Sequence, residues 1–215
     1  FALAFQDQRT LSFGLPEGTP AGLRFHVTPQ YWQRSAQGGV FKSVRNVAYR
    51  SNGEIIWNQI TPDQGGYTVE FIVKSVENTA ITVTIQPTAE LEIEALPFGM
   101  VSETSKERWI DWFRRVPPVH EKYRKMYAYA WWLMANNLIS PQGKVVYEAM
   151  TPSKINYVGL WLWDSAMHAL AYRYVDPELA RNQIRVMLAH QFPNGMLPDA
   201  VFDEGIVSVS YTHLR

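Results

Sequence analysis

Hydrophobic and polar residues alternate along three runs in the first hundred residues. The runs are Tyr67 to Lys74, Ile81 to Ile85 and Glu90 to Glu94. A period of two places one set of side chains on a core and the other in water, which is typical of half-buried β-strands. Turn-forming residues such as Asn78 and Pro87 separate the runs. Because less regular runs with similar turns precede them, we predict an antiparallel β-sandwich over residues 1–100.

The pattern changes over residues 101–118. Six polar residues from Ser102 to Glu107 begin this stretch, and Pro117 and Pro118 end it. A proline disfavours helical conformation in the residue before it, so the pair stops any helix. We predict an interdomain linker that contains one short helix, Lys106 to Arg115.

A helical period begins at Val119. Apolar residues at spacings of three and four predict a first helix that ends near Asn137. A second helix is predicted from Asp164 to about Tyr174. A third follows with Asp176 as its N-cap and Pro177 in its first turn. Short connections between helices indicate antiparallel neighbours.

Composition narrows the range of functions. The chain holds 20 Lys and Arg against 20 Asp and Glu, and it has no Cys. A net charge of zero gives no electrostatic reason to expect a nucleic acid or an anionic membrane surface as partner.

No apolar run reaches the roughly 20 residues that span a bilayer. No metal-ligand spacing, phosphate-binding loop or dinucleotide fingerprint occurs, so we expect no metal and no cofactor. Without a visible signal peptide, a cytoplasmic location is favoured, although the chain begins at Phe1.

The polar turn before the second helix holds the first candidate residues. Asp164 lies at the predicted helix start between Trp163 and Ser165, with Trp161 three residues before it. A carboxylate between aromatic rings suits a site that grips sugar hydroxyls, because Trp stacks on the apolar face of a pyranose. Asp164 is equally well explained as an N-cap or first-turn carboxylate without further function.

A second polar turn follows the third helix. Gln191 and Asn194 could donate to ligand hydroxyls, and Asp199 lies after Pro198. The alternative is an Asn-Gly turn followed by a solvated acidic loop. Glycoside hydrolysis needs two carboxyl groups, which stand about 6.5–9.5 Å apart in inverting enzymes. The sequence offers carboxylates but does not assign the pair.

Three motifs together resemble glycoside hydrolase family 63, in the clan of six-hairpin glycosidases. They are Trp161-Leu162-Trp163-Asp164-Ser165, Asp176-Pro177-Glu178-Leu179-Ala180, and Gln191 with Asn194-Gly195-Met196-Leu197-Pro198-Asp199. The family includes α-glucosidases and mannosylglycerate or glucosylglycerate hydrolases, and it is related to trehalases and glucoamylases. The resemblance covers about Val119 to Gly205.

The resemblance implies that residues 119–215 begin an (α/α)6 toroid of which most helices are missing. Trp161, Trp163 and Asp164 would line the subsite for the non-reducing sugar. Tyr157, Gln191 and Asp199 would be their neighbours, although many relatives carry His where Asp199 stands. The family's catalytic acid, an Asp, and its base, a Glu, belong to later motifs that these 215 residues do not contain.

The implied function is an inverting glycosidase. It would release a non-reducing terminal α-linked glucose or related sugar from an oligosaccharide or small glycoside, with the missing part of the catalytic domain as its necessary partner. We expect the chain to be inactive by itself. Alternatives are a trehalase- or glucoamylase-like hydrolase, a non-catalytic carbohydrate-binding protein, and a structural interaction module. The tail Val209 to Arg215 resembles a translated adapter sequence, and on that interpretation it is not native.

Overall fold

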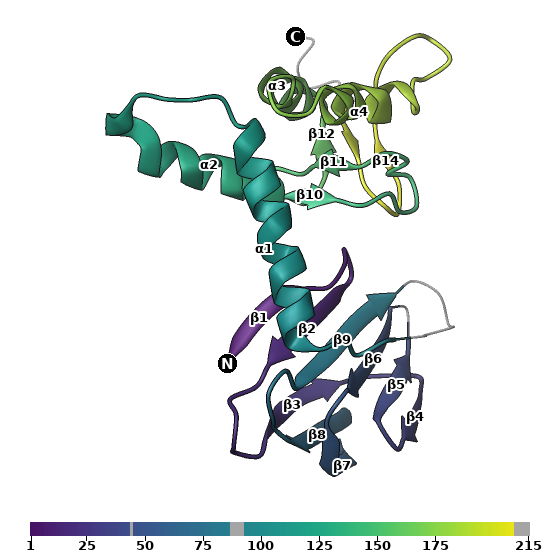
Figure 1. The fold of residues 1–215 in the computed structure, drawn as a ribbon. Coiled ribbons are helices and arrows are strands. Elements are labelled where there is room, and N and C mark those ends of the chain that lie inside the picture. The colour runs from purple at the N-terminus through teal and green to yellow at the C-terminus, as the bar shows by residue number, and fades with distance from the viewer. Residues whose placement is uncertain (44, 87–92, 209–215) are drawn as a thin grey trace. The chain divides into compact units, whose positions relative to one another are not determined.

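The computed structural model describes residues 1–43, 45–86 and 93–208. They form two compact units, Phe1–Trp109 and Ile110–Arg215, and the division falls within helix α1 (Phe98–Arg115) (Figure 1). This helix begins at Phe98 rather than at the predicted Lys106. Asn78 explains the earlier start, because its carbonyl and its Oδ1 accept the amides of Phe98 (3.0 Å) and Gly99 (3.1 Å). Most of the predicted linker is therefore helical.

The first unit consists of two antiparallel sheets. A six-stranded sheet has the order β1-β2-β9-β6-β5-β4, and a three-stranded sheet has the order β3-β8-β7. The strands are β1 (Ala2–Phe5), β2 (Thr10–Gly14), β3 (Ala21–Val27), β4 (Tyr31–Ser35), β5 (Gly38–Lys42), β6 (Asn46–Ser51), β7 (Glu54–Asp63), β8 (Gly66–Lys74) and β9 (Ala80–Gln86). Antiparallel β-structure at the N-terminal end, as predicted, is confirmed.

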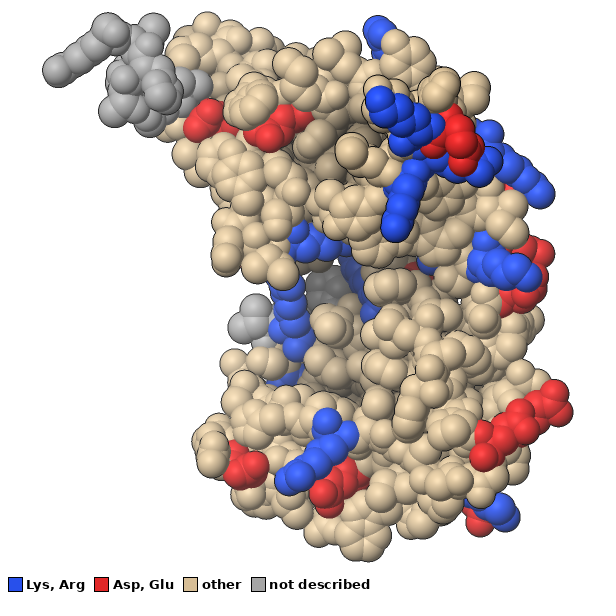
Figure 2. Space-filling view, turned by 90° about the vertical axis from the view of Figure 1, so that its left-hand side faces the viewer, with Lys and Arg blue, Asp and Glu red and all other residues tan. Residues whose placement is uncertain are grey.

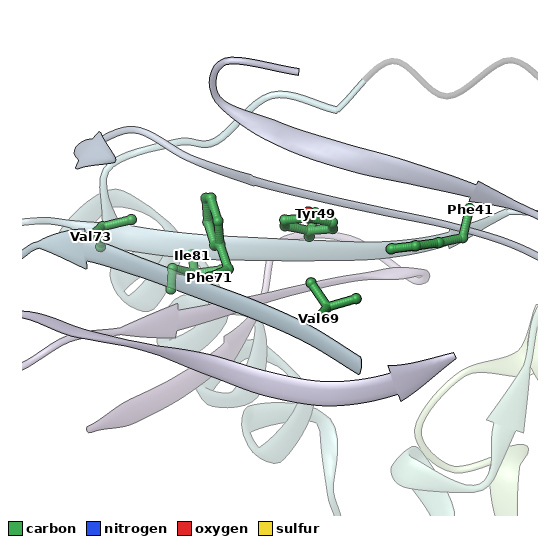
Figure 3. Packing of buried hydrophobic residues seen from close by; sticks show 6 residues of the cluster. All are labelled: Phe41, Tyr49, Val69, Phe71, Val73 and Ile81. Carbon is green, nitrogen blue, oxygen red and sulfur yellow. The ribbon is translucent and has the colours of Figure 1, made fainter. Parts of the chain in front are cut away.

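One apolar core joins these two sheets, as Figure 3 shows. Its buried members are Phe41, Tyr49 and Ile81 from the larger sheet and Val69, Phe71 and Val73 from β8. Tyr49 lies edge-on to Phe71 with ring centroids 4.9 Å apart, and its hydroxyl donates to Asn58 Oδ1 at 2.7 Å. The alternation along β8 therefore fixes which face meets the core.

The predicted alternation along β9 holds only in part. Thr82 and Thr84 were expected to face water, but both are fully buried, whereas Ile85 is 49% exposed. Strand β9 lies between β2 and β6, and the threonine hydroxyls find partners on β2. Thr82 pairs with Ser12 (3.1 Å) and Thr84 with Thr10 (3.0 Å). Paired hydroxyls can be buried at little cost, which the sequence pattern does not reveal. The run around Leu91 lies outside the described residues.

The second unit contains helices and two small sheets. The helices are η1 (Glu121–Tyr123), α2 (Arg124–Asn136), α3 (Leu162–Tyr172) and α4 (Pro177–Leu188). The sheets are β10 (Leu138–Ile139) with β11 (Ala149–Met150), and β12 (Leu160–Trp161), β13 (Ala200–Val201) and β14 (Ile206–Val207) in that order. The core of this unit holds Val145, Ala149, Leu160, Val186, Met187 and Val201. No helix among the described residues is long and apolar enough to cross a membrane.

Asp176 is the N-cap of α4, as predicted. Its Oδ1 accepts the amides of Glu178 and Leu179 at 3.1 and 3.0 Å. Pro177 occupies the first helical position. Its missing amide hydrogen costs nothing there, because the first amides of a helix have no partner within the helix. Cap and proline together fix where α4 begins.

Candidate functional site

The start of α3 is held by a backbone connection to a distant part of the chain. Strand β12 leads directly into the helix, and the first helical amide, Leu162 N, donates to the carbonyl of Asp199 at 2.9 Å. The amide of Asp199 in turn donates to Val207 on β14 at 2.9 Å. Trp161 pairs with Ala200 across the sheet. The structure thus brings the Asp199 backbone beside the first turn of α3.

Aromatic rings stack next to this turn. Tyr157 lies parallel to Trp161, with ring centroids 4.8 Å apart and an interplanar angle of 6°. Phe202 lies edge-on to Trp161, with ring centroids 6.1 Å apart. A Cβ on Gly159 would lie 2.7 Å from the Phe202 ring, so glycine is the residue that fits there. The result is a compact aromatic cluster of Tyr157, Trp161 and Phe202 beside the start of α3.

Thr151 holds the loop that carries Tyr157. Its hydroxyl lies 3.0 Å from the carbonyl oxygens of Ser153 and Tyr157 and 3.3 Å from that of Gly159. The Ser153 amide also donates to the Tyr157 carbonyl at 3.2 Å. Sequence reasoning missed Thr151, although Thr-Pro-Ser at 151–153 is a recognisable turn signal. This buried hydroxyl positions Tyr157 without itself lying in the aromatic cluster.

Two carboxylates lie close enough to Tyr157 to affect its ionisation. Partial burial, the Asp164 carboxylate and then the Asp199 carboxylate raise the pKa of the Tyr157 phenol. The phenol therefore stays protonated at neutral pH and can donate or accept a hydrogen bond. Asp164, Asp199, Tyr157 and Trp161 thus form one group, drawn from three separate segments of the chain.

Asp164 is not the N-cap of α3. Trp161 occupies that position, and Asp164 is the third residue of the helix. Its Oδ2 is buried and has no hydrogen-bond partner among the described residues, and the same holds for Nε1 of Trp161. A carboxylate oxygen that serves the helix would be engaged with its amides. The structure instead leaves a donor and an acceptor unused within the aromatic cluster.

Comparison with protein families gives an independent result. Residues 157–212 match the mannosylglycerate hydrolase MGH1-like glycoside hydrolase domain. The match supports a glycoside hydrolase of the six-hairpin clan, without singling out family 63. It contains every residue predicted for the sugar site. Comparison with curated proteins found no match.

Two of the predicted glycosidase site residues do not join the group in this structure. Trp163 is 66% exposed, because neighbouring positions on a helix point about 100° apart. Gln191 is engaged in its own loop, where its Nε2 donates to the Gly195 carbonyl at 2.8 Å. The same loop is closed by Phe192 N donating to the Met196 carbonyl at 2.8 Å. A sugar-binding role for Trp163 and Gln191 therefore stays a prediction.

No metal site emerges from the geometry of the described residues. Nowhere in residues 1–43, 45–86 and 93–208 do three or more His, Asp or Glu side chains gather closely enough to hold an ion. The polar groups gathered at this place include the carboxylates of Asp164 and Asp199, the Tyr157 phenol and the Trp161 indole N–H. Such groups exchange hydrogen bonds with neutral hydroxyls.

Proposed function

We propose that this chain is part of an inverting glycoside hydrolase that removes a non-reducing terminal α-linked glucose or related sugar. One observation carries the proposal: the Tyr157–Trp161 stack lies beside Asp164, whose Oδ2 has no hydrogen-bond partner among the described residues, within the range matched by a glycoside hydrolase domain. The aromatic surface would pack against the C–H face of the sugar ring. Asp164 would accept a hydrogen bond from a sugar hydroxyl, and the Trp161 indole would donate to another.

The surface charge agrees with a neutral ligand. On the face that Figure 2 presents, Lys and Arg side chains are interspersed with Asp and Glu and separated by uncharged residues. The whole chain has a formal net charge of zero. A polyanion such as nucleic acid would be attracted by clustered positive charge. A sugar needs none, because stacking and hydrogen bonds recognise it.

On this proposal the second unit begins an (α/α)6 domain that further helices complete. Exposed apolar side chains on its helices support this idea. On α2 they include Met126 (75% exposed) and Tyr129 (61%), and on α3 Met167 (56%). Apolar faces of this kind mark contacts with other structural elements. The acid Asp and base Glu of the inverting reaction would come from those helices, while Asp164 holds the sugar.

Sugar binding by the 215-residue chain tests the proposal. We expect methyl α-D-glucopyranoside to change the tryptophan fluorescence in a saturable manner. Trp161→Leu should abolish the change, because it removes both the stacking surface and the indole donor. Trp132→Leu, on the exposed part of α2, is the matched control and should bind as the parent does. Absence of binding to a panel of α-glucosides would contradict the proposal.

A non-catalytic carbohydrate-binding protein is the second candidate, and the unused polar atoms of the aromatic cluster suit it equally. The two are separated by hydrolysis assays on the protein with its complete catalytic domain. Release of sugar by the complete protein but not by the 215-residue chain is the expected result. Turnover by the 215-residue chain would instead place the catalytic pair within it, with Asp164 and Asp199 the first residues to test.

A further inference from the structure

Helix α3 carries a buried polar stripe. Asp164 and Ser165 lie four and three residues before His168, so these three share one face of the helix, and Trp161 is the N-cap residue just before it. Each has a buried side-chain atom without a hydrogen-bond partner: Trp161 Nε1, Asp164 Oδ2, Ser165 Oγ and His168 Nδ1. In the rest of the described chain only Ser75 Oγ shares this property. Leaving such an atom unpaired costs about 1–3 kcal/mol. Four in one stripe therefore point to a missing partner.

His168 makes a backbone hydrogen bond with Met150 on β11. Because Nδ1 has no partner, we assign this bond to the other ring nitrogen, Nε2. The Met150 amide already donates to Gln183 Oε1 at 3.0 Å, so the Met150 carbonyl is the group that accepts from His168. The ring hydrogen therefore sits on Nε2. In the neutral ring, Nδ1 then carries a lone pair and can only accept.

The surroundings favour this neutral form. Burial lowers the pKa of His168, and the Asp164 carboxylate and the Met150 bond offset part of the decrease. The strands packed on α3, β11 and β12, contain no titratable residue, and α4 contributes the neutral, fully buried Gln183 nearest to Met150. Asp164 is thus the charged group that acts on His168 within this part of the structure.

The stripe has more acceptors than donors. Asp164 Oδ2 and His168 Nδ1 both require a donated hydrogen, Ser165 can give or receive one, and Trp161 Nε1 is the single obligate donor. Hydroxyl groups on adjacent carbons of a sugar supply such hydrogens side by side. We infer that His168 is a further substrate-binding residue, accepting a hydrogen bond at Nδ1 from one sugar hydroxyl while Asp164 accepts from its neighbour. This inference rests on the proposed sugar site and adds to it a requirement for vicinal hydroxyls.

Acidification should then weaken binding. Protonation places a hydrogen on Nδ1 and removes the lone pair that the hydroxyl needs. Sugar affinity is expected to be constant above the ordinary histidine pKa of about 6.5. It should fall as the pH drops through the lowered pKa of His168.

Two substitutions separate the roles of the two ring nitrogens. His168→Gln keeps an amide N–H that can reach the Met150 carbonyl but has no counterpart of Nδ1. It should fold and bind methyl α-D-glucopyranoside about tenfold more weakly, which corresponds to the loss of one hydrogen bond of about 1.4 kcal/mol. It should also lose the part of the decrease in affinity on acidification that protonation of His168 causes. His168→Asn keeps an acceptor near the Nδ1 position and should retain more of the affinity. Titration calorimetry on the 215-residue chain measures both.

Nuclear magnetic resonance of the 15N-labelled parent chain provides a second measurement that needs no substitution. On sugar binding, the His168 Nδ1 resonance should shift as an unprotonated nitrogen does when it accepts a hydrogen bond. The inference is overturned if that resonance is unchanged in the complex, or if a folded His168→Gln variant binds with the parent's affinity and pH profile. If the parent binds no sugar at any pH, the proposed function itself fails, and the inference with it.

Discussion

Asp164 and Asp176 both lie at the start of a helix, and replacing each by alanine should change stability in opposite directions. Asp176 accepts two amides at Oδ1, and its Oδ2 forms an ion pair with Arg115 at 3.2 Å. Asp164 Oδ2 is buried without a partner among the described residues. Asp176→Ala therefore removes interactions, whereas Asp164→Ala removes an uncompensated polar atom.

The magnitudes follow from these contacts. Loss of an N-cap costs about 0.5–2 kcal/mol, and the partly exposed ion pair with Arg115 adds up to about 1 kcal/mol. At Asp164, removing the unpaired oxygen recovers about 1–3 kcal/mol, and alanine adds about 0.5 kcal/mol of helix propensity. The lost attraction between the carboxylate and the helix N-terminus subtracts about 0.3–1 kcal/mol. We expect Asp176→Ala to destabilise the chain by about 1–2 kcal/mol and Asp164→Ala to stabilise it by about 1 kcal/mol, while sugar binding is lost.

Urea unfolding at pH 7, followed by far-ultraviolet circular dichroism, measures both changes. Asp176→Asn is the control for the cap, since its side-chain oxygen still accepts the amides but forms no ion pair. It should lie between the parent and Asp176→Ala. If Asp164→Ala destabilised the chain as much as Asp176→Ala, Asp164 would serve the helix, and the case for a sugar-binding carboxylate would fail.

Two further predictions concern the second unit. Gly143→Ala should destabilise it severely, because φ is +54° and the new Cβ would lie 2.1 Å from the Asp203 carbonyl oxygen. Gly195→Ala is the control, because φ is +85° but nothing lies within 4 Å of the new Cβ. In urea unfolding the control should lose only about 1–2 kcal/mol of stability. Glu148→Gln should raise the melting temperature at pH 7, since burial and then the Asp176 charge raise the pKa of Glu148 and ionisation opposes folding. That gain should vanish below the unfolded carboxyl pKa of about 4.3, and an equal gain at pH 3.5 would contradict it.

Local patterns predicted the elements of this fold better than its long-range contacts. The period-two run of β8 and the cap of α4 depend on neighbouring residues, and both were predicted from them. The start of α1 depends on Asn78, which lies about twenty residues earlier and contacts the first turn. Burial of Thr82 depends on a hydroxyl partner seventy residues away. Such contacts leave no periodic signal in the sequence.

The candidate site divides in the same way. The aromatic and acidic motifs identified Trp161 and Asp164, but nothing in their spacing reveals that Thr151 fixes the neighbouring Tyr157. His168 lies one turn before Tyr172 on the same helix, a spacing that by itself indicates only packing. Its importance appears only when the partners of its two ring nitrogens are known.

Helix α3 shows why the site was difficult to see in the hydrophobic pattern. Its exposed face carries Trp163, Met167 and Leu170, at 66%, 56% and 52% exposure, at spacings of four and three. Its polar stripe, which includes Asp164 and the fully buried Ser165, faces inward. An isolated globular domain places polar and apolar residues the other way round. This inversion is understandable if the apolar face packs against further helices while the polar face surrounds a hydroxyl-rich ligand, which is the arrangement that the proposed (α/α)6 glycosidase requires.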